Sequence, residues 1–252
     1  MKRGTAFMHW RRPAKRPYVL GHRGARHKLP ENTLAAFKGA LDEGADGVEL
    51  DVRLTADREV IVIHDANLER VTGGRDRRAV AALTAAELGK ADVGAGEPPP
   101  LLRQVFDWAL ETGARINVEI KHDAPGTREL VDRVAGLVRA QPRLSEQVLL
   151  SCFHPGVVMR WSRLAPEVPV AWLVHERSRL FGSAPGFRLI GAAGIHPHRG
   201  LISPERLIRW RNAGAFVNVW TVNDAREAAR LGRLGVDAVI TDTPGAVLRA
   251  LG

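Results

Sequence analysis

The 252-residue chain has 45% apolar and 26% charged side chains, enough apolar content to bury a full core in one or two domains. Its single cysteine, Cys152, excludes an intramolecular disulfide framework, and no apolar run suits a transmembrane helix or a signal peptide, so we expect a cytoplasmic protein. The net charge of +9 admits a nucleic-acid or membrane binder, but the basic residues are scattered except for Arg11, Arg12, Lys15 and Arg16, and we expect no nucleic-acid partner.

Strand-like and helix-like segments alternate along the chain with short gaps. The expected strands are 18–21, 47–53, 60–64, 115–121, 148–153, 170–174, 194–196, 216–221 and 238–241, and the expected helices are 33–43, 101–112, 127–140, 155–164, 204–213 and 224–234. Sustained β-α alternation predicts a parallel sheet, either doubly wound or closed. About eight core strands favour a TIM-type (β/α)8 barrel, and no Gly-x-Gly-x-x-Gly dinucleotide motif follows the first strand.

The stretch 65–100 is too long for an ordinary loop. We expect it to be a small insertion after the second barrel strand, within a single domain that spans residues 1–252. Its main apolar residues are Leu68, Val71, Val80, Leu83, Leu88 and Val93. So small a cluster should hold a lid rather than a separately folding domain. Because the stretch begins directly after His64, we expect it to overhang the pocket.

Three carboxylates are expected at one end of the barrel, where the chemistry of this fold collects. Glu49 and Asp51 lie two residues apart on a strand, so their side chains project from the same face. Glu119 has a similar place on the strand at 115–121. Carboxylates cannot all stay ionised in a dry core without a compensating cation.

A divalent metal is the compensating cation that we expect there. Oxygen ligands of this kind suit Mg²⁺ or Ca²⁺ better than Zn²⁺, which favours more histidine and cysteine. The alternative is that Arg53 and Lys121 neutralise the carboxylates in salt bridges. A single pair of carboxylates would fit a metal and salt bridges equally well, but three carboxylates on neighbouring strands favour the metal.

Two histidines also follow expected strands beside these carboxylates. A lone histidine in such a place is more often structural, but His22 and His64 together favour proton transfer, because imidazole titrates near neutral pH. Arg23 offers a planar fork that matches phosphate geometry, and Lys121 adds a second cation. The alternative for Arg23 is a surface ion pair.

Other polar and aromatic residues are expected to support the site or to line the pocket. Thr33 is a good helix cap, while Glu31 and Asn32 lie in the first loop after a strand and are expected to brace the metal or His22. Trp220 and Phe153 end strands and are expected to line the pocket. For Phe153, plain core packing is an equal alternative.

Several short motifs, in this order and spacing, resemble the glycerophosphodiester phosphodiesterase family. They are Gly21-His22-Arg23-Gly24, Pro30-Glu31-Asn32-Thr33, Glu49-Leu50-Asp51-Val52 with Thr55 and Asp57, His64-Asp65, Glu119-Ile120-Lys121, Ser151-Cys152-Phe153, Trp220-Thr221-Val222-Asn223, Gly235-Val236-Asp237 and Thr241-Asp242 with Pro244. The resemblance covers residues 18–252. The His27-Lys28 pair departs from the small residues that the family often has there, and the insertion is rich in arginine and alanine.

The resemblance implies a TIM barrel with an insertion after the second strand and a specific division of roles. It implies that a divalent cation binds Glu49, Asp51 and Glu119, and that His22 and His64 act as general base and acid. It further implies that Arg23 and Lys121 hold the phosphate while Phe153 and Trp220 face the glycerol.

The expected reaction is metal-dependent hydrolysis of a glycerophosphodiester to an alcohol and glycerol 3-phosphate. The alternatives on the same site are a lysophospholipase D and an enzyme that stops at a cyclic phosphate. A non-catalytic basic protein is the alternative from another class, but it predicts a damaged site, and every expected catalytic position is occupied. The sequence determines neither the preferred metal, the leaving group nor the oligomeric state.

Overall fold

Eight parallel strands close into a barrel in the computed structural model, which describes residues 7–13, 15–176 and 186–252. They are β1 (Tyr18–His22), β2 (Gly47–Leu54), β4 (Arg115–Ile120), β5 (Val148–Cys152), β6 (Val170–Val174), β7 (Gly194–Pro197), β8 (Phe216–Val219) and β9 (Ala238–Thr241). Strand β1 pairs in parallel with both β9 and β2, and this double pairing closes the sheet. The predicted TIM-type barrel is confirmed.

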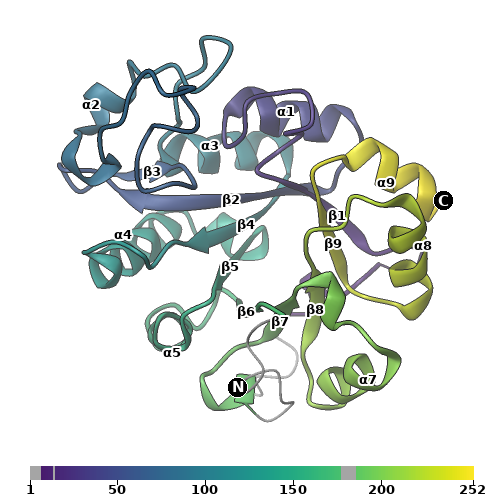
Figure 1. Ribbon diagram of the computed structural model, residues 1–252. Coiled ribbons are helices and arrows are strands. Elements are labelled where there is room, and N and C mark those ends of the chain that lie inside the picture. The colour runs from purple at the N-terminus through teal and green to yellow at the C-terminus, as the bar shows by residue number, and fades with distance from the viewer. Residues whose placement is uncertain (1–6, 14, 177–185) are drawn as a thin grey trace.

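Helices surround the barrel on the outside (Figure 1). They are α1 (Leu34–Asp42), α3 (Leu102–Thr112), α4 (Thr127–Ala140), α5 (Pro155–Leu164), α6 (Gly186–Leu189), α7 (Pro204–Asn212), α8 (Ala225–Leu234) and α9 (Pro244–Leu251). The six helices expected from the sequence are all present, and α6 and α9 are additions to them. Within the described ranges, no helix has the length and apolar character needed to cross a membrane.

Alternation along each strand separates the outer core from the barrel interior. On β2, Val48, Leu50 and Val52 are buried against the surrounding helices, so Glu49 and Asp51 project to the opposite face, into the barrel. A second apolar cluster packs separately from the outer core and comprises Trp10, Leu20, Leu149, Ala171, Phe216 and Ile240. The alternation of side chains along the pleated strand therefore places the two carboxylates on the inner face of the barrel.

The N-terminal segment contributes to this second cluster. Trp10 belongs to the 3-10 helix η1 (Met8–Trp10) and is fully buried. The guanidinium of Arg115, at the start of β4, lies over the rings of Trp10 and Tyr18, at 5.2 and 4.2 Å from their centroids. Because Arg115 and Tyr18 begin their strands, this contact is at the N-terminal end of the barrel, away from the strand ends that carry the carboxylates.

Residues 65–100 lie between β3 (Val60–Val62), which pairs antiparallel with β2, and α3. They hold the 3-10 helix η2 (Val80–Ala82) and the short helix α2 (Ala85–Leu88), beyond the edge of the barrel in Figure 1. Of the six apolar residues expected to form a core, Leu68, Val80, Leu83 and Leu88 are buried in one cluster with Ile61 and Ile63, and Val71 packs against it. Val93 is buried outside that cluster. The segment is thus anchored on the β2–β3 hairpin.

Candidate active site

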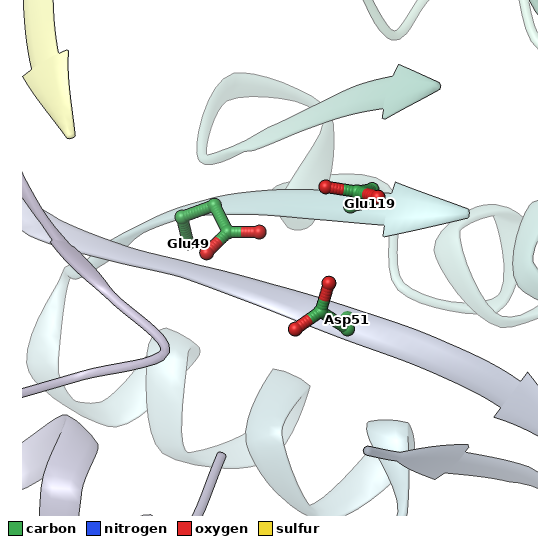
Figure 2. A group of neighbouring side chains, drawn as sticks. All are labelled: Glu49, Asp51 and Glu119. Carbon is green, nitrogen blue, oxygen red and sulfur yellow. The ribbon is translucent and has the colours of Figure 1, made fainter. Parts of the chain in front are cut away.

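Glu49, Asp51 and Glu119 meet at the carboxyl end of the barrel. The register of β2 and β4 places Asp51 directly beside Glu119. One carboxylate oxygen from each of the three residues lies within 4.8 Å of those of the other two. Figure 2 shows the three side chains grouped on neighbouring strands. Glu49 and Asp51 are almost completely buried. The expected convergence of the three carboxylates is thus present in the folded chain.

Burial and mutual repulsion make this cluster electrostatically costly. Burial and then the like charges of Asp51 and Glu119 raise the pKa of Glu49 well above its usual range. Burial and Asp51 likewise raise the pKa of Glu119. Burial also opposes ionisation of Asp51, but the positive charges of Lys121 and Arg23 outweigh it and lower the pKa of that carboxyl. The three carboxylates therefore contain more negative charge than this pocket easily holds.

Two cationic side chains offset part of that charge. Lys121 Nζ lies 2.8 Å from Glu119 Oε1 and 3.2 Å from Asp51 Oδ1. Although burial disfavours its charged form, these carboxylates raise the pKa of Lys121 to about 12. Arg23 Nε lies 3.2 Å from Asp51 Oδ2. In the described part of the chain, no Lys or Arg side chain forms an ion pair with Glu49, whose Oε2 lies 3.9 Å from Nε2 of His22.

Of the two cations named in the salt-bridge alternative, Lys121 pairs with the carboxylates and Arg53 does not. The Arg53 guanidinium donates instead to both carboxylate oxygens of Asp123, at 2.7 and 3.0 Å, and through Nε to the backbone oxygen of His64 at 2.8 Å. Arg53 ends its strand beyond the carboxylates, so it reaches the loop that follows Lys121. Arg53 therefore holds the backbone of His64, and Lys121 and Arg23 pair with the carboxylate cluster instead.

The first loop holds Arg23 and Asn32 in left-handed backbone conformations, with φ of 56° and 58°. The loop closes on itself, because Asn32 N donates to Arg23 O at 2.9 Å and Arg23 N donates to Glu49 O at 2.8 Å. Gly24 has φ of +87°, and a Cβ there would lie 2.6 Å from the backbone of Ala36, so only glycine fits. Non-glycine residues with positive φ are uncommon and cluster at functional sites.

Asn32 and Glu31 brace different residues. Asn32 Nδ2 donates to Asp51 Oδ2 at 2.9 Å, as expected for a residue that supports the carboxylate cluster. Glu31 contacts neither His22 nor the cluster: its Oε1 accepts from Arg23 Nη1 at 2.9 Å. Glu31 is therefore linked to the cluster through Arg23, which pairs with Asp51, rather than by a contact of its own. Thr33 caps α1 by accepting from Ala36 N.

Each of the two histidines is held by a carboxylate. His22 Nδ1 donates to Asp242 Oδ1 at 2.6 Å, and His64 Nδ1 donates to Asp65 Oδ1 at 2.6 Å. An ionised carboxylate can only accept, so each pair keeps the proton on Nδ1 and leaves Nε2 for exchange. Burial lowers the pKa of His64, although Asp51 opposes this shift. The backbone N of Ile63 donates to Asp51 O at 2.9 Å, which places His64 beside the cluster.

Asp242 was quoted in the sequence motif but received no role there. It follows β9 directly, the same position after a strand that singled out the other site residues. Its Oδ2 accepts from Asn223 Nδ2 at 2.7 Å, and Oδ1 lies 3.6 Å from Arg26 Nε. Burial opposes ionisation, but the hydrogen bond from His22 and the Asn223 contact lower the pKa of Asp242. No comparable signal in the sequence pointed to Arg26.

Phe153 and Trp220 lie together after β5 and β8. Their rings meet edge to face with centroids 5.5 Å apart, and both side chains are partly exposed. Trp220 Nε1 donates to the backbone oxygen of His196 at 2.7 Å, which fixes the indole. The rings of His198 and His175 extend this group, at 5.3 and 5.9 Å from the Trp220 ring. An aromatic surface thus stands at the same end of the barrel as the carboxylates.

The chain resembles known phosphodiesterases in sequence. Residues 22–246 match the model of the glycerophosphoryl diester phosphodiesterase family. A glycerophosphodiester phosphodiesterase of Caldanaerobacter subterraneus subsp. tengcongensis is 33% identical over 238 residues, which cover 90% of this chain and 94% of that protein. A glycerophosphodiester phosphodiesterase of Bacillus altitudinis is 30% identical, with 90% of this chain and 94% of that protein covered.

Solved structures show the same likeness. A putative glycerophosphoryl diester phosphodiesterase from Silicibacter pomeroyi matches with a TM-score of 0.85 at 27% identity, covering 98% of this chain and 97% of that one. An Oleispira antarctica phosphodiesterase in complex with the product sn-glycerol-3-phosphate matches with a TM-score of 0.81 at 25% identity, covering 94% and 97%. The chain belongs to the glycerophosphoryl diester phosphodiesterase family, whose members are phosphoric diester hydrolases.

Proposed function

We propose that this protein hydrolyses glycerophosphodiesters to an alcohol and glycerol 3-phosphate with the help of a divalent cation. The observation that carries the proposal is the meeting of two carboxylate-held histidines and a buried cluster of three carboxylates at one end of the barrel. The glycerol 3-phosphate product bound to the Oleispira antarctica phosphodiesterase supports the same product here.

The residues present fit a divalent cation such as Mg²⁺ or Ca²⁺. The donor set, Glu49, Asp51 and Glu119, consists of carboxylate oxygens, which hard cations prefer. Burial, and then the neighbouring negative charge that Lys121 and Arg23 leave uncompensated, raise the pKa values of Glu49 and Glu119. When bound, the cation would neutralise phosphoryl oxygens and so ease attack on an anionic phosphodiester.

The side chains around this cluster provide the remaining parts of the reaction. Arg23 and Lys121 bind the phosphodiester anion, and Phe153 and Trp220 line the glycerol side of the pocket. His22 takes a proton from the attacking water, and His64 gives one to the departing alcohol oxygen. Asp242 and Asp65 keep the two imidazoles in the tautomer and orientation that this exchange requires.

We propose small polar leaving groups such as choline or ethanolamine rather than lysolipids. The buried apolar residues of the 65–100 segment pack against Ile61 and Ile63, so little apolar surface of the segment remains to bind an acyl chain. Where the segment faces the first loop, Arg70 meets Glu31 and Asp65, so its border with the site is charged. The large apolar side chains that are well exposed among the described residues, Leu189 and Ile208, belong to α6 and α7.

The substrate preference is tested by comparing kcat/KM for glycerophosphocholine and lysophosphatidylcholine, each with saturating Mg²⁺ or Ca²⁺. We expect glycerophosphocholine to be preferred by roughly tenfold or more, since the charged border formed by Arg70, Glu31 and Asp65 disfavours acyl chains. Phosphorus NMR of the products should show glycerol 3-phosphate. A preference for the lysolipid would support the lysophospholipase D alternative, and accumulation of a cyclic phosphate would support the cyclising one.

A further inference from the structure

A single arginine of the 65–100 segment joins two carboxylates at the edge of the site. Arg70 Nε donates to Asp65 Oδ2 at 2.6 Å, while Nη2 and Nη1 donate to Glu31 Oε1 and Oε2 at 2.6 and 3.1 Å. The planar guanidinium therefore sets the spacing between Asp65 and Glu31. We call this group, Arg70 with Asp65 and Glu31, the arginine clamp.

Each carboxylate of the arginine clamp also holds a residue of the proposed site. Asp65 Oδ1 accepts from His64 Nδ1 at 2.6 Å, and Glu31 Oε1 accepts from Arg23 Nη1 at 2.9 Å. Arg23 and His64 are thus connected through a continuous series of alternating charges in which Arg70 is the central member. Burial opposes ionisation of Glu31 and Asp65, but the hydrogen bonds from Arg70 lower the pKa of both carboxyls.

The turn that carries Arg70 is fixed by its own contacts. Leu68 is fully buried, and Thr72 is 5% exposed. Thr72 Oγ1 donates to Leu68 O at 2.8 Å, and Thr72 N donates to the same oxygen at 3.0 Å. Arg70 therefore extends from a rigid support, and the guanidinium is held in place before any ligand arrives.

We propose that Arg70 is a positioning residue, which orients His64 through Asp65 and Arg23 through Glu31 and so makes the 65–100 segment part of the catalytic machinery. The proposal rests on the proposed function, because it assigns His64 and Arg23 to that reaction. It goes beyond the sequence expectation that the segment is a lid over the pocket. Residues that orient catalytic side chains typically change activity by about 10- to 100-fold when removed.

The alternative is that the arginine clamp is an ordinary ion pair that adds stability alone. The Arg70 side chain is 49% exposed, and exposed ion pairs contribute little to stability, about 0–1 kcal/mol. A purely structural clamp therefore predicts small changes in both melting temperature and turnover. A positioning clamp predicts a large loss of kcat with a small change in melting temperature.

The test compares Arg70→Ala and Arg70→Lys with Arg77→Ala in the metal-loaded enzyme acting on glycerophosphocholine. Arg77 is a matched control, since it lies in the same segment and pairs with exposed Glu69 at 3.1 Å, away from the site. We expect Arg70→Ala to lower kcat about 10- to 100-fold. The kcat of Arg70→Lys should lie between those of wild type and Arg70→Ala, and the kcat of Arg77→Ala should stay within roughly twofold of wild type. Added methylguanidine should restore part of the Arg70→Ala activity, and methylamine should not.

A second measurement keeps the inference separate from the proposed function. The Nδ1 proton of His64, bonded to Asp65, should give a downfield imidazole signal in proton NMR that His64→Asn removes. We expect Arg70→Ala to weaken or shift this signal and Arg77→Ala to retain it, whether or not glycerophosphocholine is a substrate. Unchanged kcat in Arg70→Ala, or an unchanged His64 signal, overturns the inference. An inactive wild type with a signal that depends on Arg70 would overturn the proposed function alone.

Discussion

Glu49→Gln should abolish turnover of glycerophosphocholine while the protein stays folded. The amide keeps the shape of the side chain but removes one of three charges from the proposed cation site, and we expect a loss of about 100- to 1000-fold or more. Because burial and like charges raise the pKa of Glu49, the ionised carboxylate destabilises the fold at neutral pH. In EDTA, Glu49→Gln should therefore unfold at the same temperature as wild type or higher.

Asp51→Asn should lose activity to a similar degree but differ in stability. Lys121 and Arg23 lower the pKa of Asp51 despite its burial, so the ionised carboxylate stabilises the fold at neutral pH, and the amide should lower the melting temperature. Calorimetric titration with Mg²⁺ and Ca²⁺ measures cation binding in both variants. Glu59→Gln is a suitable control, because Glu59 pairs with Arg103 on the exposed side of the hairpin. Normal cation affinity in Glu49→Gln would remove Glu49 from the site.

His22→Ala and His64→Ala should each lower kcat by roughly 100-fold or more, as removal of a general acid or base does. Both imidazoles are held by carboxylates, with Nδ1 engaged and Nε2 left for proton transfer. Because neither histidine belongs to the carboxylate cluster, cation affinity should change little.

His27→Ala is the matched control for both histidine variants. His27 lies in the same loop as His22 and pairs with Glu43 at 3.2 Å, and its Nδ1 lies 3.0 Å from the backbone oxygen of Asp242. The Asp242 carboxylate that holds His22 does not depend on this backbone contact, so removal of His27 should leave kcat near that of wild type. Single-turnover kinetics and calorimetric cation titration would be measured on all three variants. If either His22→Ala or His64→Ala retained near-normal kcat, that histidine would be structural and its assignment wrong.

The barrel and its carboxylates could be predicted because both follow from local periodicity. In the run Gly47–Leu54, apolar residues alternate with Glu49 and Asp51, and the pleat of a strand alone sends the two sets to opposite faces. The same rule placed Glu119 on the next strand of the barrel. Parallel strands bring such residues to one end of the fold without any knowledge of the loops.

Contacts made by loops and termini were harder to predict from the sequence. The Arg70 contacts with Glu31 join positions 39 residues apart, and nothing in the spacing of either loop encodes that meeting. Trp10 lies in a basic N-terminal stretch without periodicity, yet it is fully buried. Helix α9 was missed although Pro244 occupies its first turn, a favourable helix start.

The β2–β3 hairpin was predicted correctly, but the contact partner of Arg53 in it was not. In the salt-bridge alternative Arg53 balanced the carboxylates, and it does continue the alternation of Glu49 and Asp51 along β2. Its long side chain instead reaches Asp123 in the loop after β4, at 2.7 Å, and the backbone of His64. Periodicity thus gave the face of the strand, while the loop geometry determined the contact.

The central claim is that hydrolysis of a glycerophosphodiester depends on a cation held by Glu49, Asp51 and Glu119. The most direct test is turnover of glycerophosphocholine by the purified protein after treatment with EDTA, followed by addition of Mg²⁺ or Ca²⁺, with products identified by phosphorus NMR. We expect no turnover in EDTA and full recovery of glycerol 3-phosphate formation on addition of at least one of the two cations. Undiminished turnover in excess EDTA, or no turnover with either cation, would contradict it.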